Sequence, residues 1–399
     1  MTGDPASRVA AIVQCSWQRA GRNGRRTENK YVPMLRIPFL ILLYLHAVLH
    51  LLGFAKAFGL AALPQLPHTI SRPWGLLWLA AGALLLTTAT LLSFASRWWW
   101  VVGAVAGVTS QVVIVASWSD ARFGTFANIA LLAGVAWGCA HRGPWSLPAA
   151  YERALALATP GRLAEVLTEA DLAGLPAPVQ RYVRAAGVVG QPRVQNLRAT
   201  WTGRIRSGPR AAWMDFTADQ LDTFDTPRRF FLMDAVMKGL PVDVFHAFDE
   251  HGATMRVRLL SVKSMVDASG AVLTRSETVT LFNDLCLLAP GELVRPAIAW
   301  DAIDEHAARA HYTQGTNTIS ATLQFNDANE LVDFHSDDRN PSPDGSTAGP
   351  TPWTTPVRDY GRVGPARVFR TGETRWHPAS GTWTYGEFAL QSLAYNVGR

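Results

Sequence analysis

Two histidines and a glutamine stand inside apolar stretches of the sequence, where strongly polar side chains are unusual. His46 and His50 are four residues apart in the segment 34–57, and Gln111 lies in the apolar segment 98–117. Residues four apart project from the same face of a helix, so both imidazoles would point in one direction. Polar side chains within membrane segments normally face the interior of a helix bundle. We therefore expect His46, His50 and Gln111 to lie inside a bundle, with a hydrogen bond between Gln111 and one imidazole.

The same histidines allow three kinds of chemistry. Two imidazoles on one face could bind a metal ion, but a site needs a third or fourth ligand, and the apolar segments offer no clear one. A bis-histidine haem needs ligands on opposing helices, and His141 at the end of the fourth apolar segment is badly placed. A proton or solute pathway would normally use intramembrane carboxylates as well. A structural polar contact is favoured, a pathway or small-ligand pocket and a metal or haem site stay open, and no metal ligands or cofactor are assigned.

A second set of candidates lies in the last third of the chain. Several aromatic residues there would line a pocket if the sheet has one, and two polar residues sit where a strand ends before the loop 340–352, a common position for the rim of a site. The candidate ligand-binding residues are Trp353, Trp376, Trp383, Tyr385, His335 and Asp338. The alternatives are packing of the aromatic residues in the core and a solvated turn for the polar pair.

Four apolar segments could position the histidines. They cover approximately residues 34–57, 73–95, 98–117 and 123–140, and each approaches the roughly 20 residues that a helix needs to cross a membrane. Small residues spaced by four, Gly103 with Gly107 and Gly134 with Gly138, favour close helix packing. Arginines concentrate before the first segment, between the second and third, and after the fourth. This bias predicts a multi-pass protein of the cell (inner) membrane with both termini in the cytoplasm.

The remaining segments predict a different architecture after residue 141. Residues 142–190 are expected to form a helical connector, with Thr168 and Asp171 as a near capping box. From about residue 191 apolar and polar residues alternate, as in 197–206, 255–259 and 319–325, which is typical of antiparallel strands with one covered face. One amphipathic helix, at about 277–288 with Ser276 as its cap, is expected to interrupt them.

The predicted fold is α+β: a transmembrane bundle of four helices, a helical connector, and a curved antiparallel sheet resembling a half-barrel. The expected divisions are a basic disordered tail over 1–33, transmembrane helices over 34–141, the connector over 142–190, and a β-rich soluble domain over 191–399. Met34 stands where a membrane protein often begins, so it is an alternative start to Met1.

Composition excludes several functional classes. The formal net charge is +6, but much of it comes from the tail and the flanks of apolar segments, and no nucleic-acid-binding motif is present. The cysteines, Cys15, Cys139 and Cys286, give neither a disulfide framework nor a CxxC metal site. No hydrolase, metalloprotease, P-loop or Rossmann signature occurs. Membrane lipids and an apolar small molecule are the expected partners, and nucleic acid is not.

Several motifs resemble an uncharacterised bacterial family of membrane proteins with a domain of unknown function. In the second half these are LPAPVQRYVRAAGVVGQPRV, GLPVDV, the triplet Thr351-Pro352-Trp353 and LAYNV; in the first half they are HLLGFAKAFGL, GLLWLAAGALLL and WSDARFGTFANI. The resemblance covers about residues 40–399. It implies a module of four spans followed by a β domain similar to lipoprotein-carrier half-barrels, and no assigned activity.

Three functions remain in competition. The leading hypothesis is that the β domain binds an apolar or lipidic ligand at the membrane. The first alternative is a membrane enzyme or redox component that uses the intramembrane histidines. The second is a membrane-tethered scaffold that binds a partner protein.

Overall fold

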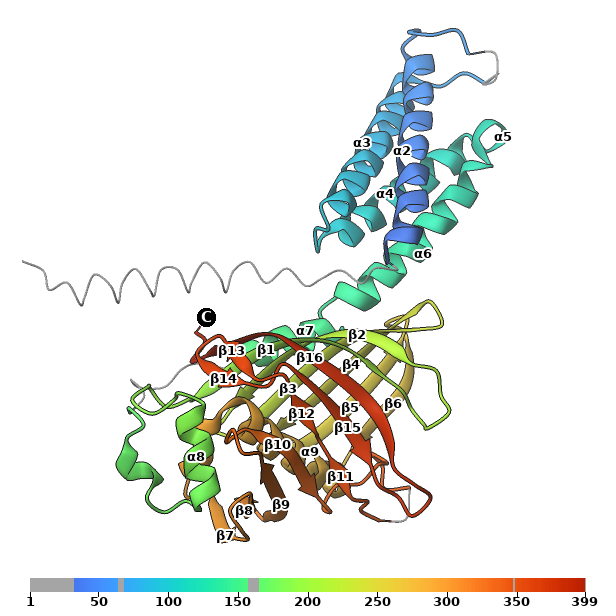
Figure 1. Ribbon diagram of the computed structural model, residues 1–399. Helices are drawn as coiled ribbons and strands as arrows, with labels where there is room; N and C mark the ends of the chain where they lie inside the picture. Colours follow the sequence, from blue (N-terminus) through green and yellow to red (C-terminus); the bar gives the residue numbers. More distant parts are fainter. Residues whose placement is uncertain (1–31, 64–67, 157–164, 347–348, 399) are drawn as a thin grey trace, which may run out of the picture.

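The computed structural model of the 399-residue chain describes residues 32–63, 68–156, 165–346 and 349–398. The predicted basic tail lies outside the described residues except for its last two positions. Figure 1 shows a bundle of helices standing on a strongly curved sheet.

The bundle is built from helices that match the apolar segments of the sequence. Three of them are long and apolar enough to cross a membrane: Arg36–Ala57, Arg72–Ser93 and Trp99–Ala116. The fourth predicted span forms a helix of 19 residues that is not among these three, so its crossing of a membrane stays a prediction. The helices of the bundle are α2 (Val32–Ala57), α3 (Arg72–Ser93), α4 (Trp99–Ala116), the short α5 (Trp118–Ala121) and α6 (Gly124–Arg142).

Small residues bring these helices together, as the sequence predicts. A side chain at Gly53 would place its Cβ 2.2 Å from the ring of Trp78, so the indole occupies that space. Gly103 and Gly107 of α4 meet α6 in the same way, and Gly134 of α6 meets Phe39 of α2. Backbones that approach this closely gain packing contacts that larger residues would prevent.

The connector joins the bundle to the sheet through short helices. They are α7 (Leu147–Leu155), the 3₁₀ turn η1 (Glu169–Leu172) and α8 (Ala177–Ala185). Ser146 caps α7 by accepting a hydrogen bond from the Ala149 amide at 3.1 Å. The predicted capping box before η1 is present: the Thr168 amide donates to Asp171 at 2.7 Å. Leu147 and Tyr151 of α7 pack on the outer face of the sheet against Leu221 and Phe230.

One sheet of 14 strands forms most of the β domain, which we define as Asn196–Tyr395. Its order is β6-β5-β4-β3-β2-β1-β16-β15-β11-β10-β9-β8-β7, with β12 paired to β15, and β13 and β14 form a separate pair. The strands are β1 (Asn196–Ile205), β2 (Met214–Thr223), β3 (Arg228–Met237), β4 (Leu240–Asp249), β5 (Gly252–Leu259), β6 (Lys263–Ser269), β7 (Ile298–Ala302), β8 (Ala307–Gln314), β9 (Asn317–Phe325), β10 (Leu331–Ser336), β11 (Trp353–Thr354), β12 (Val357–Arg358), β13 (Gly361–Val363), β14 (Ala366–Val368), β15 (Thr371–Trp376) and β16 (Trp383–Tyr395).

The sheet is an open, curved antiparallel sheet, which confirms the predicted fold class. Leu197, Ala199 and Trp201 of β1 lie in the core, whereas Arg204 lies on the opposite face and pairs with Glu387 of β16. The two edge strands, β6 and β7, are consecutive in the chain and are connected by α9 (Ala271–Leu288) and the 3₁₀ turn η2 (Pro290–Val294). Figure 1 shows α9 inside the curve of the sheet.

Helix α9 differs from the predicted helix at 277–288 in two ways. It begins at Ala271, because Gly270 takes a φ of 114° that turns the chain sharply out of β6; the Ser276 side chain instead accepts a hydrogen bond from the Asn340 amide at 3.0 Å. It is also not amphipathic, since 14 of its 18 residues are buried. A helix enclosed on nearly all sides by a sheet has no polar face to give to water.

Candidate functional site

The two histidines of α2 form a polar cluster inside the bundle. His46 and His50 are 4% and 1% exposed. His50 Nδ1 lies 2.9 Å from the carbonyl oxygen of His46, so it must be the donor, and its Nε2 can accept from Ser110 Oγ at 3.0 Å. His46 Nε2 lies 3.1 Å from Ser110 Oγ and 3.0 Å from Asn128 Oδ1. The cluster thus gives partners to three of the four ring nitrogens, His46 Nε2, His50 Nδ1 and His50 Nε2, as expected for a structural polar contact.

Gln111 contacts the histidines through another residue, not directly as the sequence suggests. It accepts from Asn128 Nδ2 at 2.9 Å and donates to Thr125 Oγ1 at 3.2 Å. Asn128 therefore stands between Gln111 and the imidazole, in place of the expected direct bond. Within the described parts of the chain, no group of three or more His, Cys, Asp and Glu side chains is arranged to hold a metal ion.

The four predicted aromatic residues gather at one end of the β domain. Trp353 of β11 pairs with Trp376 of β15, and Trp376 pairs in turn with Trp383 of β16. The rings of Trp376 and Tyr385 stack with centroids 5.6 Å apart, and Trp353 Nε1 donates to the Tyr385 hydroxyl at 3.0 Å. Trp353 and Trp376 are buried, whereas Trp383 and Tyr385 stay partly exposed. The strands bring all four together, and Trp383 and Tyr385 are exposed enough to contact a ligand.

Arg339 completes this arginine–aromatic cluster. Its guanidinium lies over Trp353, 4.4 Å from the ring centroid, and over Trp376 at 5.6 Å. Its Nη1 donates to the Tyr385 hydroxyl at 2.7 Å, while its buried Nε has no hydrogen-bond partner. A cation on an aromatic face is worth about 0.5–2 kcal/mol, and the vacant Nε–H could donate to an anionic or carbonyl oxygen.

The predicted polar pair is separated by the sheet. His335 lies on the outer face, beside Asp337 at 3.0 Å, because Phe334 and Ser336 on either side of it are buried. Asp338 accepts from Arg275 of α9 at 2.6 Å and from the Ser320 amide at 2.7 Å. Asp338 therefore anchors the chain after β10 to α9, next to Arg339, whereas His335 points away from Trp353, on the other face of the sheet.

A buried charged network lies between α9 and strands β2 to β4. Arg229 Nε donates to Asp284 Oδ2 at 2.7 Å, and its Nη1 lies 3.3 Å from Glu277 Oε2. Gln220 donates to both Asp222 and Asp284 at 2.7 Å and accepts from Trp201 Nε1 at 2.9 Å. His246 lies 3.4 Å from Glu277. We define the network as Gln220, Asp222, Arg229, His246, Glu277 and Asp284.

Burial and neighbouring charges shift the pKa values of the carboxyl groups in this network. Burial, together with the charge of Asp284, raises the pKa of Asp222 well above its usual range. Burial also raises the pKa of Asp284, although Arg229 opposes the shift. Burial disfavours the charged form of Glu277, but contact with His246 and the charges of Arg229 and Arg339 outweigh it and lower the pKa of Glu277 to about 2. The network therefore shifts the pKa values of Asp222 and Glu277 in opposite directions.

The network and the arginine–aromatic cluster adjoin each other through Glu277 and Arg339. Glu277 feels the charge of Arg339, and Arg275 and Ser276 next to it bind the chain at Asp338 and Asn340. Sequence reasoning missed the network, because Gln220 and Asp222 are polar and alternate with the apolar Leu221, although they share a face of β2 with Phe216 and Ala218. The available signal was the apolar run FFLM directly after Arg229, which shows no alternation and so indicates a strand covered on both faces.

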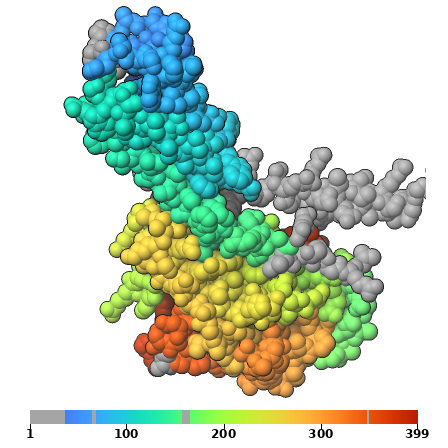
Figure 2. Space-filling view, turned by 180° about the vertical axis from the view of Figure 1, so that it is seen from behind, coloured from blue at the N-terminus to red at the C-terminus, as the bar shows by residue number. Residues whose placement is uncertain are grey.

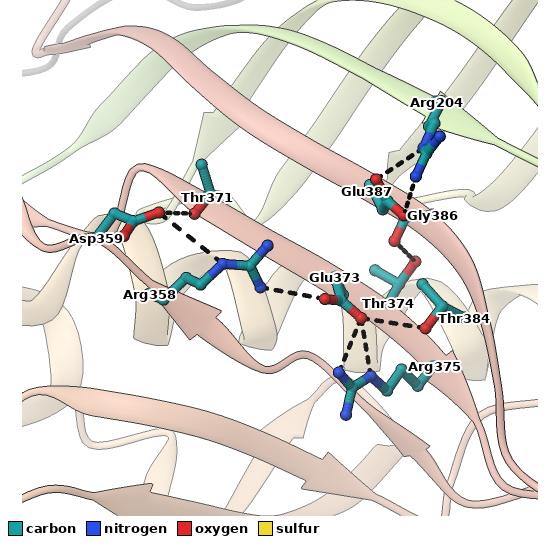
Figure 3. A network of polar contacts seen from close by, with 10 residues as sticks. All are labelled: Arg204, Arg358, Asp359, Thr371, Glu373, Thr374, Arg375, Thr384, Gly386 and Glu387. Carbon is teal, nitrogen blue, oxygen red and sulfur yellow. Dashed lines mark hydrogen bonds and ion pairs between the residues drawn. The ribbon is translucent and has the colours of Figure 1, made fainter.

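A second polar network lies on the outer face of the sheet. Glu373 of β15 accepts from Arg375 at 2.8 Å, from Arg358 at 3.1 Å and from Thr384 at 3.1 Å. Arg204 pairs with Glu387 nearby (Figure 3). Ion pairs of this kind, open to water, contribute about 0–1 kcal/mol each. These contacts join β1, β15 and β16 and help to fix their register; they do not form a site.

Comparisons with known proteins identify a family. The model of a family described as "Family of unknown function (DUF6544)" matches residues 165–388. No curated protein matches the chain. Among solved structures, the chain is similar to a domain from Vibrio parahaemolyticus provisionally described as an outer membrane lipoprotein-sorting protein domain, with 10% identity, a TM-score of 0.31, and coverage of 51% of this chain and 86% of that one. It is also similar to a DUF1329 family protein from Desulfovibrio piger, with 12% identity, a TM-score of 0.29, and coverage of 56% and 93%.

Proposed function

The chain belongs to the family of unknown function DUF6544, and we propose that its β domain binds an apolar or lipidic ligand at the membrane. The observation that carries the proposal is a row of inner-face side chains that α9 leaves partly exposed. Strands normally bury such residues or cover them with another element. The row comprises Ile205, Met237, Met255, Val257, Leu259, Val266 and Phe388.

Polar groups at the edge of this row suit a ligand with one polar end. Met255 pairs with His246 across β4 and β5, and His246 contacts Glu277, which feels the charge of Arg339. On the other arm of the sheet, Trp383 and Tyr385 are partly exposed beside Arg339. Ligand pockets typically combine apolar walls with a few convergent polar groups. The unpartnered Nε–H of Arg339 would donate a hydrogen bond to the polar end of the ligand. The methionine and valine side chains of the row would contact its apolar part.

The protein is proposed to lie in the cell membrane with the β domain on the cytoplasmic side. Three helices have the length and hydropathy to cross a membrane. Positive charge is concentrated on the cytoplasmic flanks of membrane segments, and the proposed orientation places Arg36, Arg97, Arg142 and Arg153 there. A ligand held by the β domain would then stay close to the bilayer from which it could be drawn.

Photo-crosslinking of the full chain tests the proposal. The protein in nanodiscs is illuminated with palmitic acid carrying a diazirine, and crosslinked peptides are located by mass spectrometry. We expect labelling of β4, β5 and β16, with competition by unlabelled fatty acid. Met255→Glu should abolish the β5 label, because it places a charge on the inner face, whereas Thr254→Glu on the outer face should not. Labelling confined to the helices of the bundle, or unaffected by Met255→Glu, would refute the proposal.

A further inference from the structure

The end of the bundle that faces the β domain is fixed by named contacts. Arg142, the last residue of α6, donates to the Ala95 carbonyl just beyond α3 at 3.1 Å. Arg36 near the start of α2 donates to the Leu92 carbonyl at 2.7 Å. These helix ends therefore lie at one level, where the apolar spans stop and lipid head groups would begin.

The turn between β5 and β6 lies at this same level. His141 Nδ1, next to the end of α6, is 3.0 Å from Ser261 Oγ in the turn. Arg258 Nη1 of β5 lies 3.3 Å from the Trp145 carbonyl, just after α6. Figure 2 shows the yellow part of the β domain, which contains β5 and β6, directly beneath the teal end of the bundle.

A basic pocket opens where these parts meet. Its volume is about 370 Å³. Arg256 and Arg258 lie two positions apart on β5 and supply two positive charges, against one negative charge from Asp267 on β6. The buried Nε of Arg256 has no hydrogen-bond partner. The junction pocket is lined by Ala140, Trp145, Arg256, Arg258, Ser261, Val262, Ser264 and Asp267.

Exposed apolar side chains surround the junction pocket. Trp145 is 65% exposed and Val262 67%, and Leu260 and Met265 of the same hairpin are also exposed. Leu260 and Ser261 have φ values of 55° and 60°, so the tip is a sharply formed turn. A soluble anion would make no favourable contact with these apolar side chains. A surface that combines arginine, tryptophan and aliphatic residues is instead typical of a membrane interface.

We propose that the junction pocket binds the head group of an anionic phospholipid, with its phosphate on Arg256 and Arg258 and its glycerol and upper acyl chains against Trp145 and Val262. This site lies on the outer face of the sheet and is separate from the proposed inner-face ligand. A lipid bound there would bridge α6 and the β5–β6 hairpin. It would also give the unpartnered Nε–H of Arg256 a charged acceptor, which is among the stronger hydrogen bonds that proteins form.

Hydrogen exchange of the full chain in nanodiscs tests this inference. The discs contain phosphatidylcholine alone or an equal mixture with phosphatidylglycerol. We expect amides of the β5–β6 hairpin to exchange about tenfold more slowly in the anionic discs, the factor for a site about 90% occupied. Inorganic phosphate added to the phosphatidylcholine discs should not reproduce this protection.

Two variants and one control decide the assignment. The double variant Arg256→Gln/Arg258→Gln should lose the lipid-dependent protection. Ser264→Asp should lose it too, although it leaves both arginines in place and changes an exposed residue. The matched control Arg309→Gln/Arg362→Gln removes two exposed arginines elsewhere and should keep it. Equal exchange in both kinds of disc, protection that survives in the double variant, or full protection by inorganic phosphate would each overturn the proposal.

Discussion

Replacement of Arg229 by methionine gives the sharpest test of the buried charged network. Arg229 is 7% exposed and faces Asp284 at 2.7 Å and Glu277 at 3.3 Å. Methionine keeps much of the apolar stem but leaves both carboxylates buried without their cation. Breaking a buried ion pair by removing one partner costs about 3–5 kcal/mol. We therefore expect Arg229→Met to lower the free energy of unfolding of the β domain by about this amount.

Pulse proteolysis in urea measures the effect on the full chain in nanodiscs. With an m-value of about 2–3 kcal/mol/M, the loss should lower the urea midpoint of the β domain by about 1–2 M. Arg309→Met replaces an exposed arginine of β8 and should change the free energy of unfolding by less than about 0.5 kcal/mol. This control separates the effect of the site from that of losing any arginine.

The pH dependence separates charge from packing. In the wild type, the pKa of Glu277 is lowered to about 2, so its contribution to stability is present above the unfolded pKa of about 4.3 and is lost as the pH falls towards 2. In the variant only His246 and Arg339 still lower the pKa of Glu277, so Glu277 protonates at a higher pH than in the wild type and the deficit should shrink between pH 7 and pH 5. A deficit below about 1 kcal/mol, or one that does not vary with pH, would refute the reasoning.

Three further predictions follow from individual contacts. Asp222→Asn should stabilise the β domain at pH 8 and lose that advantage below pH 4, because the raised pKa of Asp222 makes its stability contribution complete at low pH and smaller as the pH rises; urea midpoints at several pH values measure this. Gly53→Ala should destabilise the bundle by about 1–3 kcal/mol, since its Cβ would lie 2.2 Å from the Trp78 ring, whereas Val48→Ala at an exposed position should not; thermal unfolding in detergent compares the two. Tyr385→Phe removes the acceptor of Trp353 Nε1 and Arg339 Nη1 and should cost about 1–3 kcal/mol, seen as a lower urea midpoint without loss of β signal in circular dichroism.

The sequence was sufficient for features that depend on periodicity. The alternation of Leu197, Ala199 and Trp201 with arginines and threonines predicts β1 and its buried face, and the structure confirms both. Likewise, the four-residue spacing of His46 and His50 predicts a shared face, and both are buried. Local patterns of this kind are informative because the period of the chain is fixed by its backbone geometry.

Features that depend on long-range contacts could not be found in this way. Gln220 and Asp222 alternate with Leu221 as a solvent face would, yet the aspartate and glutamine are buried under α9 and Leu221 is buried under α7. The start of α9 was missed because Gly270 looks like any loop glycine until its φ of 114° is known. The pairing of Arg339 with Trp353 and Tyr385 also depends on strands whose order no local pattern specifies.

The pairing of β1 with β16 has a consequence for synthesis of the chain. The two strands lie side by side at the centre of the sheet, but they are far apart in the chain: Thr200 and Ser392, which are in contact, are separated by 192 residues. At about 5–20 residues per second, the ribosome needs about 10–40 s after it has made β1 to deliver the partner strand. Throughout that time β1 to β6 can form a meander whose edge at β1 is open, and an open edge strand invites pairing with other chains. Chains that end before β16 should therefore aggregate through β1, even though every residue of the first meander is present.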